Sequence, residues 1–576
     1  MRLHDPNNRM KNENMNKRRV LIASVCASLM LVLALAVFGP LVSLRAQRAA
    51  QKKRERTKKE QPREQTKQAK TKERPAAKES PAAKEEATPA TSSSEAATEL
   101  GRNIDHEIDA SEFASAHWGV FVLNLRDGRV IYAREAGKPF TPASNMKAYT
   151  TAVALDQLGA DYRWRTSVYA AAEPDASGTI DGDLVLYGRG APDLTSRTKG
   201  NTPDRLAQLA DDLYRRGVRH VRGNVVGDES YFQGEALGDG WLWNDVQWYF
   251  GAEVSALSIN GNEATLTITS AGKAGEPASV KFDTPSDYLH VINDTSTAER
   301  GRPLTIGVTR GLSDNDVRVW GDFRAGGGSY NVRISVHKPA LWAATLFRDE
   351  LNARGIKVDG DARMIDARTR RASGDEKSDA SRGVELASIT GKTLGEIVRP
   401  TNKESLNFNA ELILRTLGKE RGATAPDSDP VRTRIRGDDQ AGLAVMRLWL
   451  ERAGVPTDNL ALHDGSGLSR LDLVTPEATA RLMAAIAKTP SASVFRDSLP
   501  VAGRDGTLRG RLGGAAGRIQ AKTGTLTYTN SLSGYVTTAD NETLAFAIIC
   551  NDETERESST KVIDAIATLL AKYSER

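Results

Sequence analysis

One largely apolar segment constrains the fold of this 576-residue chain more than any other. Residues 145–158 are rich in alanine, follow Pro142 and Ser144, and stop at Gly159. This is the pattern of a helix covered on most sides, because little polar surface remains to meet water. A glycine just after the last residue is a typical helix end. The sequence therefore predicts a central helix with a domain packed around it.

Ser144 and Lys147 stand at the start of this predicted helix. Residues three apart share one face of a helix, so the lysine amine can reach the serine hydroxyl. Burial lowers the pKa of a lysine, and a neutral lysine can take the proton of a serine nucleophile. The alternative is that Ser144 only caps the helix and Lys147 is solvated. Four other S-x-x-K runs lack this context, and we interpret them as structural: Ser196–Lys199, Ser270–Lys273, Ser335–Lys338 and Ser558–Lys561.

A second polar cluster, Ser405-Leu406-Asn407, lies between helical patterns at 394–398 and 409–417. A short loop there can direct a hydroxyl and an amide into a cleft. Ordinary helix capping is the alternative. The same S-x-N spacing occurs at Ser258–Asn260 and Ser329–Asn331, so position in the chain is what favours Ser405 and Asn407.

The run Lys522-Thr523-Gly524 occurs once, at the end of the strand-like stretch 518–524. A cation on an exposed strand edge suits a substrate carboxylate, and the threonine adds a hydroxyl. Glycine lets a substrate backbone approach closely. A phosphate-binding loop is disfavoured, since Ala521 stands where a glycine must precede the lysine.

These three motifs together resemble the S-x-x-K, S-x-N and K-T-G set of penicillin-binding proteins and serine β-lactamases. The chain is similar to the low-molecular-mass D-alanyl-D-alanine carboxypeptidase/endopeptidase branch (class C) of that superfamily. The resemblance implies a serine-type peptidase that cleaves peptidoglycan stem peptides through an acyl-enzyme, and β-lactam antibiotics as covalent inhibitors of the same serine.

The resemblance also assigns roles to individual residues. Ser144 is the implied nucleophile and Lys147 its base, while Ser405 relays protons to the leaving group. Asn407 holds a substrate amide, and the backbone N–H groups of Ser144 and Thr525 form an oxyanion hole. Lys522, Thr523 and Gly524 complete the substrate-binding edge.

Three further stretches are similar to this branch: 182–193, 228–244 and 464–470. In related enzymes the residues matching Asp228 and Phe232 contact the free amino end of the substrate's diamino acid, and the residue matching Arg470 lines the site. The alternative is structural, because Asp464 to Gly467 has the composition of a turn and Phe232 suits a core.

The N-terminal segment 20–44 carries no charge and is long enough to span a bilayer. We expect a membrane anchor that holds the protein at the periplasmic face of a bacterial inner membrane. A cleaved signal peptide is the alternative, but this apolar run exceeds the usual signal core and small residues are missing near its end.

Residues 45–98 contain no aromatic residue and little apolar surface, which predicts a disordered basic linker. Residues 1–98 hold 21 lysines and arginines against 10 acidic residues, a net charge of +11. Subtracting this from the whole-chain +5 leaves −6 for residues 99–576. The positive charge belongs to the linker region, so a nucleic-acid partner is not expected.

Neither a metal nor a cofactor is predicted. The seven histidines show no H-E-x-x-H, and no G-x-S-x-G elbow is present. Cys26 lies in the apolar run and Cys550 in a strand-like stretch, so a disulfide between them is implausible.

The predicted fold is α+β: a β-lactamase/penicillin-binding transpeptidase-like catalytic domain, an antiparallel sheet flanked by helices, with large inserted β-rich domains. Strand patterns at 118–125, 129–132, 518–522, 531–537 and 542–550, with a closing helix at 559–573, place both ends of the folded part in one sheet. The expected organisation is a cytoplasmic N-terminus (1–19), the anchor (20–44), the linker (45–98), a first catalytic part (99–165), inserted domains (166–370, with a nested domain at about 264–334) and a second catalytic part (371–576).

Two functional alternatives stay open from sequence alone. A β-lactamase shares the nucleophile but must deacylate quickly, and a catalytically idle wall-binding scaffold can keep the fold. The long insertion and linker disfavour the first, and the survival of all three motifs disfavours the second. Carboxypeptidase and endopeptidase activity are not distinguished.

Overall fold

The computed structural model describes residues 95–196, 204–284, 287–372, 382–422, 437–554 and 558–575. The predicted N-terminus, the anchor and the linker up to residue 94 lie outside the described residues. Helix α2 (Glu95–Asp109) includes the last four residues of the predicted linker, 95–98. Within the described ranges, no helix combines the length and apolarity needed to cross a membrane.

The two ends of the folded part form one antiparallel sheet, as predicted. Its five strands follow the order β17-β18-β19-β1-β2. Its strands are β1 (His117–Asn124), β2 (Val130–Arg134), β17 (Ile519–Leu526), β18 (Thr529–Thr537) and β19 (Thr543–Asn551). Strands β1 and β19 pair over their whole length, from His117 opposite Asn551 to Asn124 opposite Leu544. Because β17 is at the edge, one side of that strand lacks a neighbouring strand within the described sheet.

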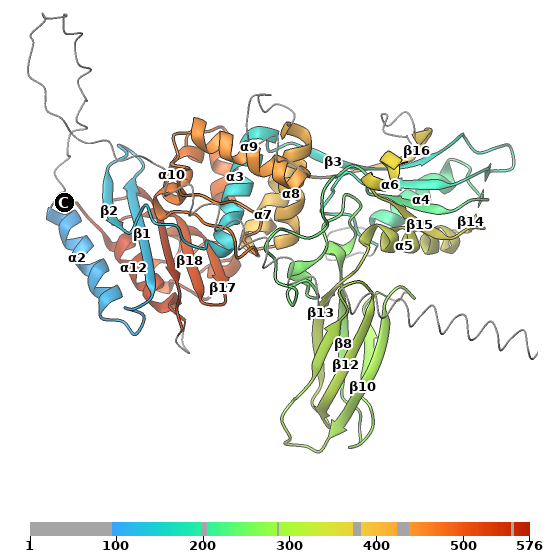
Figure 1. The fold of residues 1–576 in the computed structure, drawn as a ribbon, viewed down its shortest axis with the longest axis horizontal. Helices are drawn as coiled ribbons and strands as arrows, with labels where there is room; N and C mark the ends of the chain where they lie inside the picture. Colours follow the sequence, from blue (N-terminus) through green and yellow to red (C-terminus); the bar gives the residue numbers. More distant parts are fainter. Residues whose placement is uncertain are drawn as a thin grey trace, which may run out of the picture. The chain divides into compact units, whose positions relative to one another are not determined.

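Helices cover both faces of this sheet (Figure 1). Val120 and Val122 of β1 pack in one core with α2 and the closing helix α12 (Thr560–Lys572). Phe121 and Leu123 point to the opposite face, since side chains alternate along a strand, and pack with α3 (Met146–Leu158) and α10 (Pro476–Ile486). The first ten residues of α3 are all buried, so the predicted central helix is confirmed. The helices α7 (Leu394–Lys403), α8 (Asn407–Arg421), α9 (Asp438–Arg452) and α11 (Ala492–Ser498) complete its surroundings.

A second five-stranded sheet, in the order β15-β7-β5-β3-β16, builds the larger part of the insertion. Its strands are β3 (Arg163–Ala170), β5 (Leu184–Tyr187), β7 (Val225–Asp228), β15 (Ala362–Ile365) and β16 (Val384–Thr393). A small parallel sheet of β4 (Thr179–Ile180), β6 (His220–Val221) and β14 (Lys357–Val358) lies in the same part of the chain. The helices here are α4 (Arg205–Arg215), α5 (Pro339–Ala353) and α6 (Ala367–Ala372).

This arrangement differs from the prediction in one respect. β16 pairs with β3 in the sheet of the insertion, so the chain returns to the catalytic helices only after Thr393 and not at 371. The insertion is rich in β-structure, as predicted, and helices α4 and α5 pack into its core. A strand pattern tells which segment pairs but not which sheet it joins.

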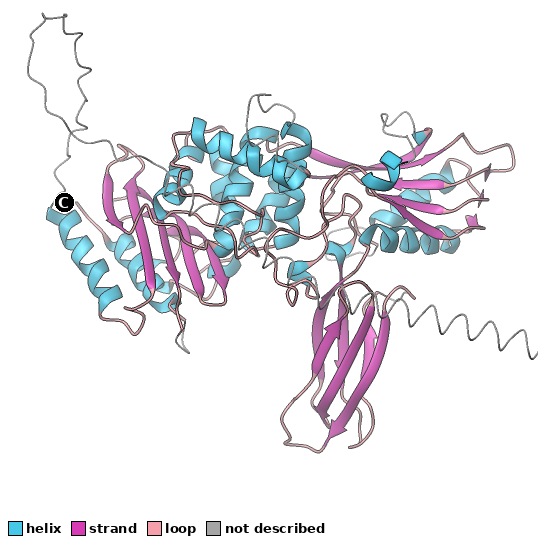
Figure 2. Cartoon of the chain, in the orientation of Figure 1, coloured by secondary structure: helices cyan, strands magenta, loops and turns pink. Residues whose placement is uncertain are grey.

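The nested part consists of two three-stranded sheets, β13-β8-β9 and β10-β12-β11. Its strands are β8 (Glu263–Thr269), β9 (Ser279–Phe282), β10 (His290–Ala298), β11 (Gly307–Arg310), β12 (Asp316–Arg324) and β13 (Ser329–Ser335). The two sheets share one apolar core that includes Leu266, Val317 and Ile334. Its described residues form strands without a long helix, whereas helices accompany both larger sheets (Figure 2). We call residues 263–335 the nested sandwich.

Candidate active site

Ser144 lies in a 3-10 turn, Ala143–Asn145, that leads directly into α3. Ala143 has a φ of 50°, a left-handed conformation that is strained for a residue other than glycine. The side chain of Asn145 fixes the turn to β18, because its amide donates to Ser531 and accepts from Ser533. The hydroxyl of Ser531 also donates to the carbonyl oxygen of Pro142 at 2.7 Å. The nucleophile candidate is therefore held rigidly against the sheet.

The amine of Lys147 is fully buried one helical turn after Ser144. Its Nζ lies 2.8 Å from Oγ of Ser144, 2.6 Å from Oδ1 of Asn407 and 2.6 Å from the carbonyl oxygen of Ser466. Burial lowers the pKa of Lys147 from 10.5 to about 7, although nearby carboxylates of Asp464, Glu411 and Asp472 oppose this shift. The predicted geometry, a buried lysine amine within hydrogen-bonding distance of a serine hydroxyl, is present.

Ser405 and Asn407 lie where α7 ends and α8 begins. Ser405 has a φ of 59°, so the turn that carries its hydroxyl is a second strained position. Its Oγ accepts a hydrogen bond from Nζ of Lys522 at 3.0 Å. The amide of Asn407 accepts from Lys147 and donates through Nδ2 to the carbonyl oxygen of Phe250 at 2.9 Å. Sequence analysis found both residues but missed Phe250, because a backbone carbonyl leaves no signal in the sequence.

Lys522 lies on the edge strand β17, as predicted, but its side chain is buried and not exposed. Besides Ser405, its Nζ donates to the carbonyl oxygen of Thr523 at 2.8 Å. Burial and the adjacent Lys147 hold the pKa of Lys522 well below its usual value. The correction has a physical reason: the amine of Lys522 meets the hydroxyl of Ser405, a residue more than a hundred positions earlier, and the strand's own sequence does not reveal that partner.

Gly524 brings β17 against the Ser144 turn. A Cβ atom added at Gly524 would lie 2.7 Å from the carbonyl oxygen of Pro142 and 3.1 Å from the backbone N of Ser144. The adjacent Thr523 shares a hydroxyl hydrogen bond of 2.7 Å with Thr507, and the exposed Thr525 contacts Asn530 at 2.9 Å. Only a residue without a side chain permits this approach, so the glycine of the motif has a steric explanation.

Asp464 is a buried functional candidate that sequence analysis treated only as part of a turn. Its two carboxylate oxygens accept hydrogen bonds from Ser466 N (3.0 Å), Gly467 N (2.6 Å), Ser469 N (2.8 Å), Ser466 Oγ (3.1 Å) and Trp241 Nε1 (2.9 Å). These bonds shape the loop whose Ser466 carbonyl accepts from Lys147. A carboxylate inside a glycine-rich run is the signal that could have identified it.

The three residues assigned through related enzymes lie in different surroundings. Nη1 of Arg470 donates to the carbonyl oxygen of Thr527 at 3.4 Å, just beyond the end of β17. Phe232 packs with Phe408, the residue after Asn407, in a small apolar cluster. Both are therefore close to elements of the candidate site.

Asp228 differs from the prediction. It is buried at the end of β7, where its Oδ2 lies 2.7 Å from Nη1 of Arg370 and 2.9 Å from Nε of Arg382. Two guanidinium groups already neutralise this carboxylate, so it is not open to a substrate ammonium group. The arginines follow Asp228 by more than a hundred residues, and the sequence did not indicate the pairing.

Comparison with known proteins gives consistent results. Residues 100–573 match the D-Ala-D-Ala carboxypeptidase 3 (S13) family. The chain is 33% identical to a D-alanyl-D-alanine carboxypeptidase of Actinomadura sp. (strain R39), over 84% of this chain and 87% of that protein. It is 25% identical to the D-alanyl-D-alanine carboxypeptidase DacB of Haemophilus influenzae, over 77% and 87% of the two chains. The crystal structure of penicillin binding protein 4 (dacB) from Haemophilus influenzae shares the fold, with a TM-score of 0.67 at 24% identity, and covers 83% of this chain and 99% of its own.

Proposed function

The chain belongs to the D-Ala-D-Ala carboxypeptidase 3 (S13) family, and from this premise we propose that it is a serine-type D-Ala-D-Ala carboxypeptidase of peptidoglycan stem peptides with Ser144 as its nucleophile. The single observation that carries the assignment of the nucleophile is the 2.8 Å contact between its Oγ and the buried amine of Lys147. No other S-x-x-K run whose residues are all described has a hydrogen bond between its serine and its lysine.

In the proposed acylation step, Oγ of Ser144 attacks the carbonyl carbon of the D-Ala-D-Ala amide while its proton moves to the neutral amine of Lys147. A C–O bond forms, the C–N bond breaks, and the proton passes to the departing amine of the terminal D-alanine. Ser405 is proposed to take part in this relay, since its hydroxyl accepts a hydrogen bond from the buried amine of Lys522. Water then attacks the ester and releases the shortened peptide, with Lys147 as base.

The developing oxyanion is proposed to bind the backbone N–H groups of Ser144 and Thr525. The support is the close approach of β17 at Gly524 to the backbone N of Ser144. Asn407 has a second N–H bond left for a substrate carbonyl, because its first goes to Phe250. Lys522 and Thr523 are proposed to bind the terminal carboxylate, which would draw a proton onto the buried lysine.

A labelled penicillin tests the nucleophile, because the strained amide of a β-lactam mimics the scissile bond. We expect the purified full-length protein to take up one label, recovered on the peptide that contains Ser144, and a Ser144→Ala variant to take up none. Ser270→Ala, at the serine of another S-x-x-K run, is the matched control and should label normally. Normal labelling of the Ser144→Ala protein would remove the assignment.

Turnover separates the remaining alternatives. A peptidase should release D-alanine from diacetyl-Lys-D-Ala-D-Ala and keep its penicilloyl ester for minutes or longer. Fast loss of the ester without peptide hydrolysis would indicate a β-lactamase. Stable folding with neither reaction would indicate an idle scaffold.

We further propose that the enzyme acts outside the cytoplasm and is attached to the membrane by residues 20–44. The support is the uncharged length of this segment and the location of the proposed substrate in the cell wall. Full-length protein should stay with alkali-washed membranes, and a variant lacking residues 1–44 should not. Mass spectrometry of a mature protein that starts after residue 44 would favour a cleaved signal peptide instead.

A further inference from the structure

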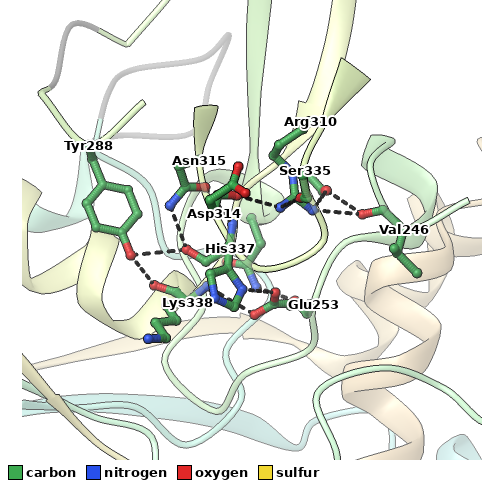
Figure 3. Close-up of polar contacts among 11 residues, drawn as sticks. Val246, Glu253, Tyr288, Arg310, Asp314, Asn315, Ser335, His337 and Lys338 are labelled. Carbon is green, nitrogen blue, oxygen red and sulfur yellow. Dashed lines mark hydrogen bonds and ion pairs between the residues drawn. The ribbon is translucent and has the colours of Figure 1, made fainter. Parts of the chain in front are cut away.

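The segment 246–253 connects the nested sandwich to the candidate active site. At its first residue, the carbonyl oxygen of Val246 accepts hydrogen bonds from Nη2 of Arg310 at 3.1 Å and from Oγ of Ser335 at 2.6 Å (Figure 3). Arg310 and Ser335 are the last residues of β11 and β13. The next residue, Gln247, accepts from the backbone N of Ser335 at 3.0 Å. The start of the segment is therefore hydrogen-bonded to the last residues of β11 and β13 in the nested sandwich.

Glu253 fastens the other end. Its carboxylate lies 2.5 Å from Nδ1 of His337 and accepts from the backbone N of Lys338 at 3.0 Å (Figure 3). Tyr288 donates to the carbonyl oxygens of both His337 and Lys338 at 3.0 Å. The run Ser335-Val-His-Lys338 has the S-x-x-K spacing of the catalytic motif. In the structure, its residues form hydrogen bonds with both ends of the segment 246–253.

Between these anchors, the carbonyl oxygen of Phe250 accepts the 2.9 Å hydrogen bond from Nδ2 of Asn407. An asparagine amide has a donor end and an acceptor end that exchange when the amide rotates by half a turn. A carbonyl oxygen only accepts, so Phe250 admits only the donor end. The acceptor end, Oδ1, must then face Nζ of Lys147, which lies 2.6 Å away.

Arg310, which holds Val246, is unusual because it is a buried cation with uncharged hydrogen-bond partners. It is buried, and its guanidinium contacts the carbonyl oxygens of Gly311, Asp314 and Val246 and the hydroxyl of Ser335, none of them charged. A buried cation without a directly bonded carboxylate costs free energy. The contacts of this guanidinium hold the ends of β11 and β13 and the carbonyl of Val246 in one arrangement.

We propose that the nested sandwich is a positioning element for catalysis: Arg310 and Glu253 hold the segment 246–253 so that the Phe250 carbonyl fixes the amide of Asn407 between Lys147 and substrate. This inference rests on the proposed function. Arg310 and Glu253 are positioning residues, because they act through Phe250 and Asn407 and touch neither substrate nor the reacting atoms.

A double-mutant cycle in the full-length protein tests the proposal. Arg310→Met removes the donors to Val246 and keeps the length of the side chain, and Asn407→Ala removes the amide that the segment orients. We expect each single variant to acylate with penicillin at least about tenfold more slowly than the parent. The double variant should be no more than about twofold slower than Asn407→Ala alone, because the segment then has nothing left to orient.

If the acylation rate of the double variant falls by the product of the two single-variant factors, the inference is overturned while the proposed function stays intact. A normal rate for Asn407→Ala would instead count against the proposed function. Arg318→Met, at an exposed arginine of the same sandwich that pairs with Asp294, is the matched control and should leave the rate unchanged.

Glu253→Gln is a second variant that tests the proposal even if the Arg310 variant misfolds. It loosens the opposite end of the segment, so we expect the same non-additivity with Asn407→Ala. The peptide substrate gives a second readout: both positioning variants should lower kcat/KM for diacetyl-Lys-D-Ala-D-Ala at an unchanged thermal unfolding midpoint of the catalytic domain. Loss of activity in proportion to loss of folded protein would contradict positioning.

Discussion

Lys147 and Asn407 lie 260 residues apart in the chain, yet Nζ of the lysine donates to Oδ1 of the asparagine at 2.6 Å. The bond joins the first turn of α3 to the first residue of α8, and the same amine contacts Ser144 and Ser466. One buried nitrogen thus joins Ser144, Asn407 and the loop shaped by Asp464 in a single site.

The first prediction concerns pH. Because the pKa of Lys147 is lowered to about 7, the neutral and active form of its amine increases as pH rises through 7. Acylation by penicillin should therefore rise between pH 6 and 8 and level off above, as stopped-flow labelling can measure. A flat profile from pH 5.5 to 9 would contradict the role of Lys147 as base.

Glu411 provides the control for that profile, since burial raises the pKa of its carboxyl to about 7 as well. Its negative charge raises the pKa of Lys147, so Glu411→Gln should move the rising limb to lower pH. Disappearance of the limb in this variant would assign the titration to Glu411.

The second prediction compares two buried aspartates. Asp464 accepts five hydrogen bonds, and each of its two carboxylate oxygens accepts at least two of them. In an Asp464→Asn variant the amide NH₂ would therefore face hydrogen-bond donors in both of its possible orientations. We expect a loss of about 3 kcal/mol or more and a lower thermal unfolding midpoint. Burial and Asp464 raise the pKa of Asp472 well above its usual value, which favours its neutral form, so Asp472→Asn should cost less than Asp464→Asn. Equal losses in calorimetry would refute this assignment of charge.

The third prediction concerns the approach of β17 to the Ser144 turn. Gly524→Ala places a methyl group 2.2 Å from Oγ of Ser531 and 2.7 Å from the carbonyl of Pro142, so the strand must move away. We expect penicillin acylation to fall by at least about a hundredfold, as for loss of an oxyanion donor. Gly510→Ala, at a glycine with no atom within 4 Å of the added Cβ, should acylate normally. Comparable rates for both variants would argue against the proposed oxyanion hole.

The fourth prediction separates a structural Asp228 from a substrate-binding one. Asp228→Asn replaces the buried carboxylate that pairs with Arg370 and Arg382 by a neutral amide, which should cost about 3 kcal/mol and lower the unfolding midpoint of the insertion. The ratio of KM values for peptides with a free and an acetylated lysine side chain should not change. A selective rise in KM for the free amine would restore the substrate role. Asp181→Asn, at an exposed pair with Arg222, is the control for stability.

The sequence by itself determined the features that local spacing encodes. The contact of Ser144 with Lys147 follows from a three-residue step on a helix, and the burial of α3 follows from its apolar composition. Strand patterns similarly identified β1, β18 and β19, and the strand-like stretch that ends in Lys522-Thr-Gly524 identified β17.

Only the tertiary structure decided which distant groups share one environment. It buried Lys522 under the Ser405 turn, gave Asp228 two arginines, moved β16 into the sheet of the insertion, and set the Phe250 carbonyl against Asn407. The physical reason is that burial, and the partner of a charge or of a backbone carbonyl, depend on the packing of segments far apart in the chain. Residue spacing carries that information only within a helical turn or a strand.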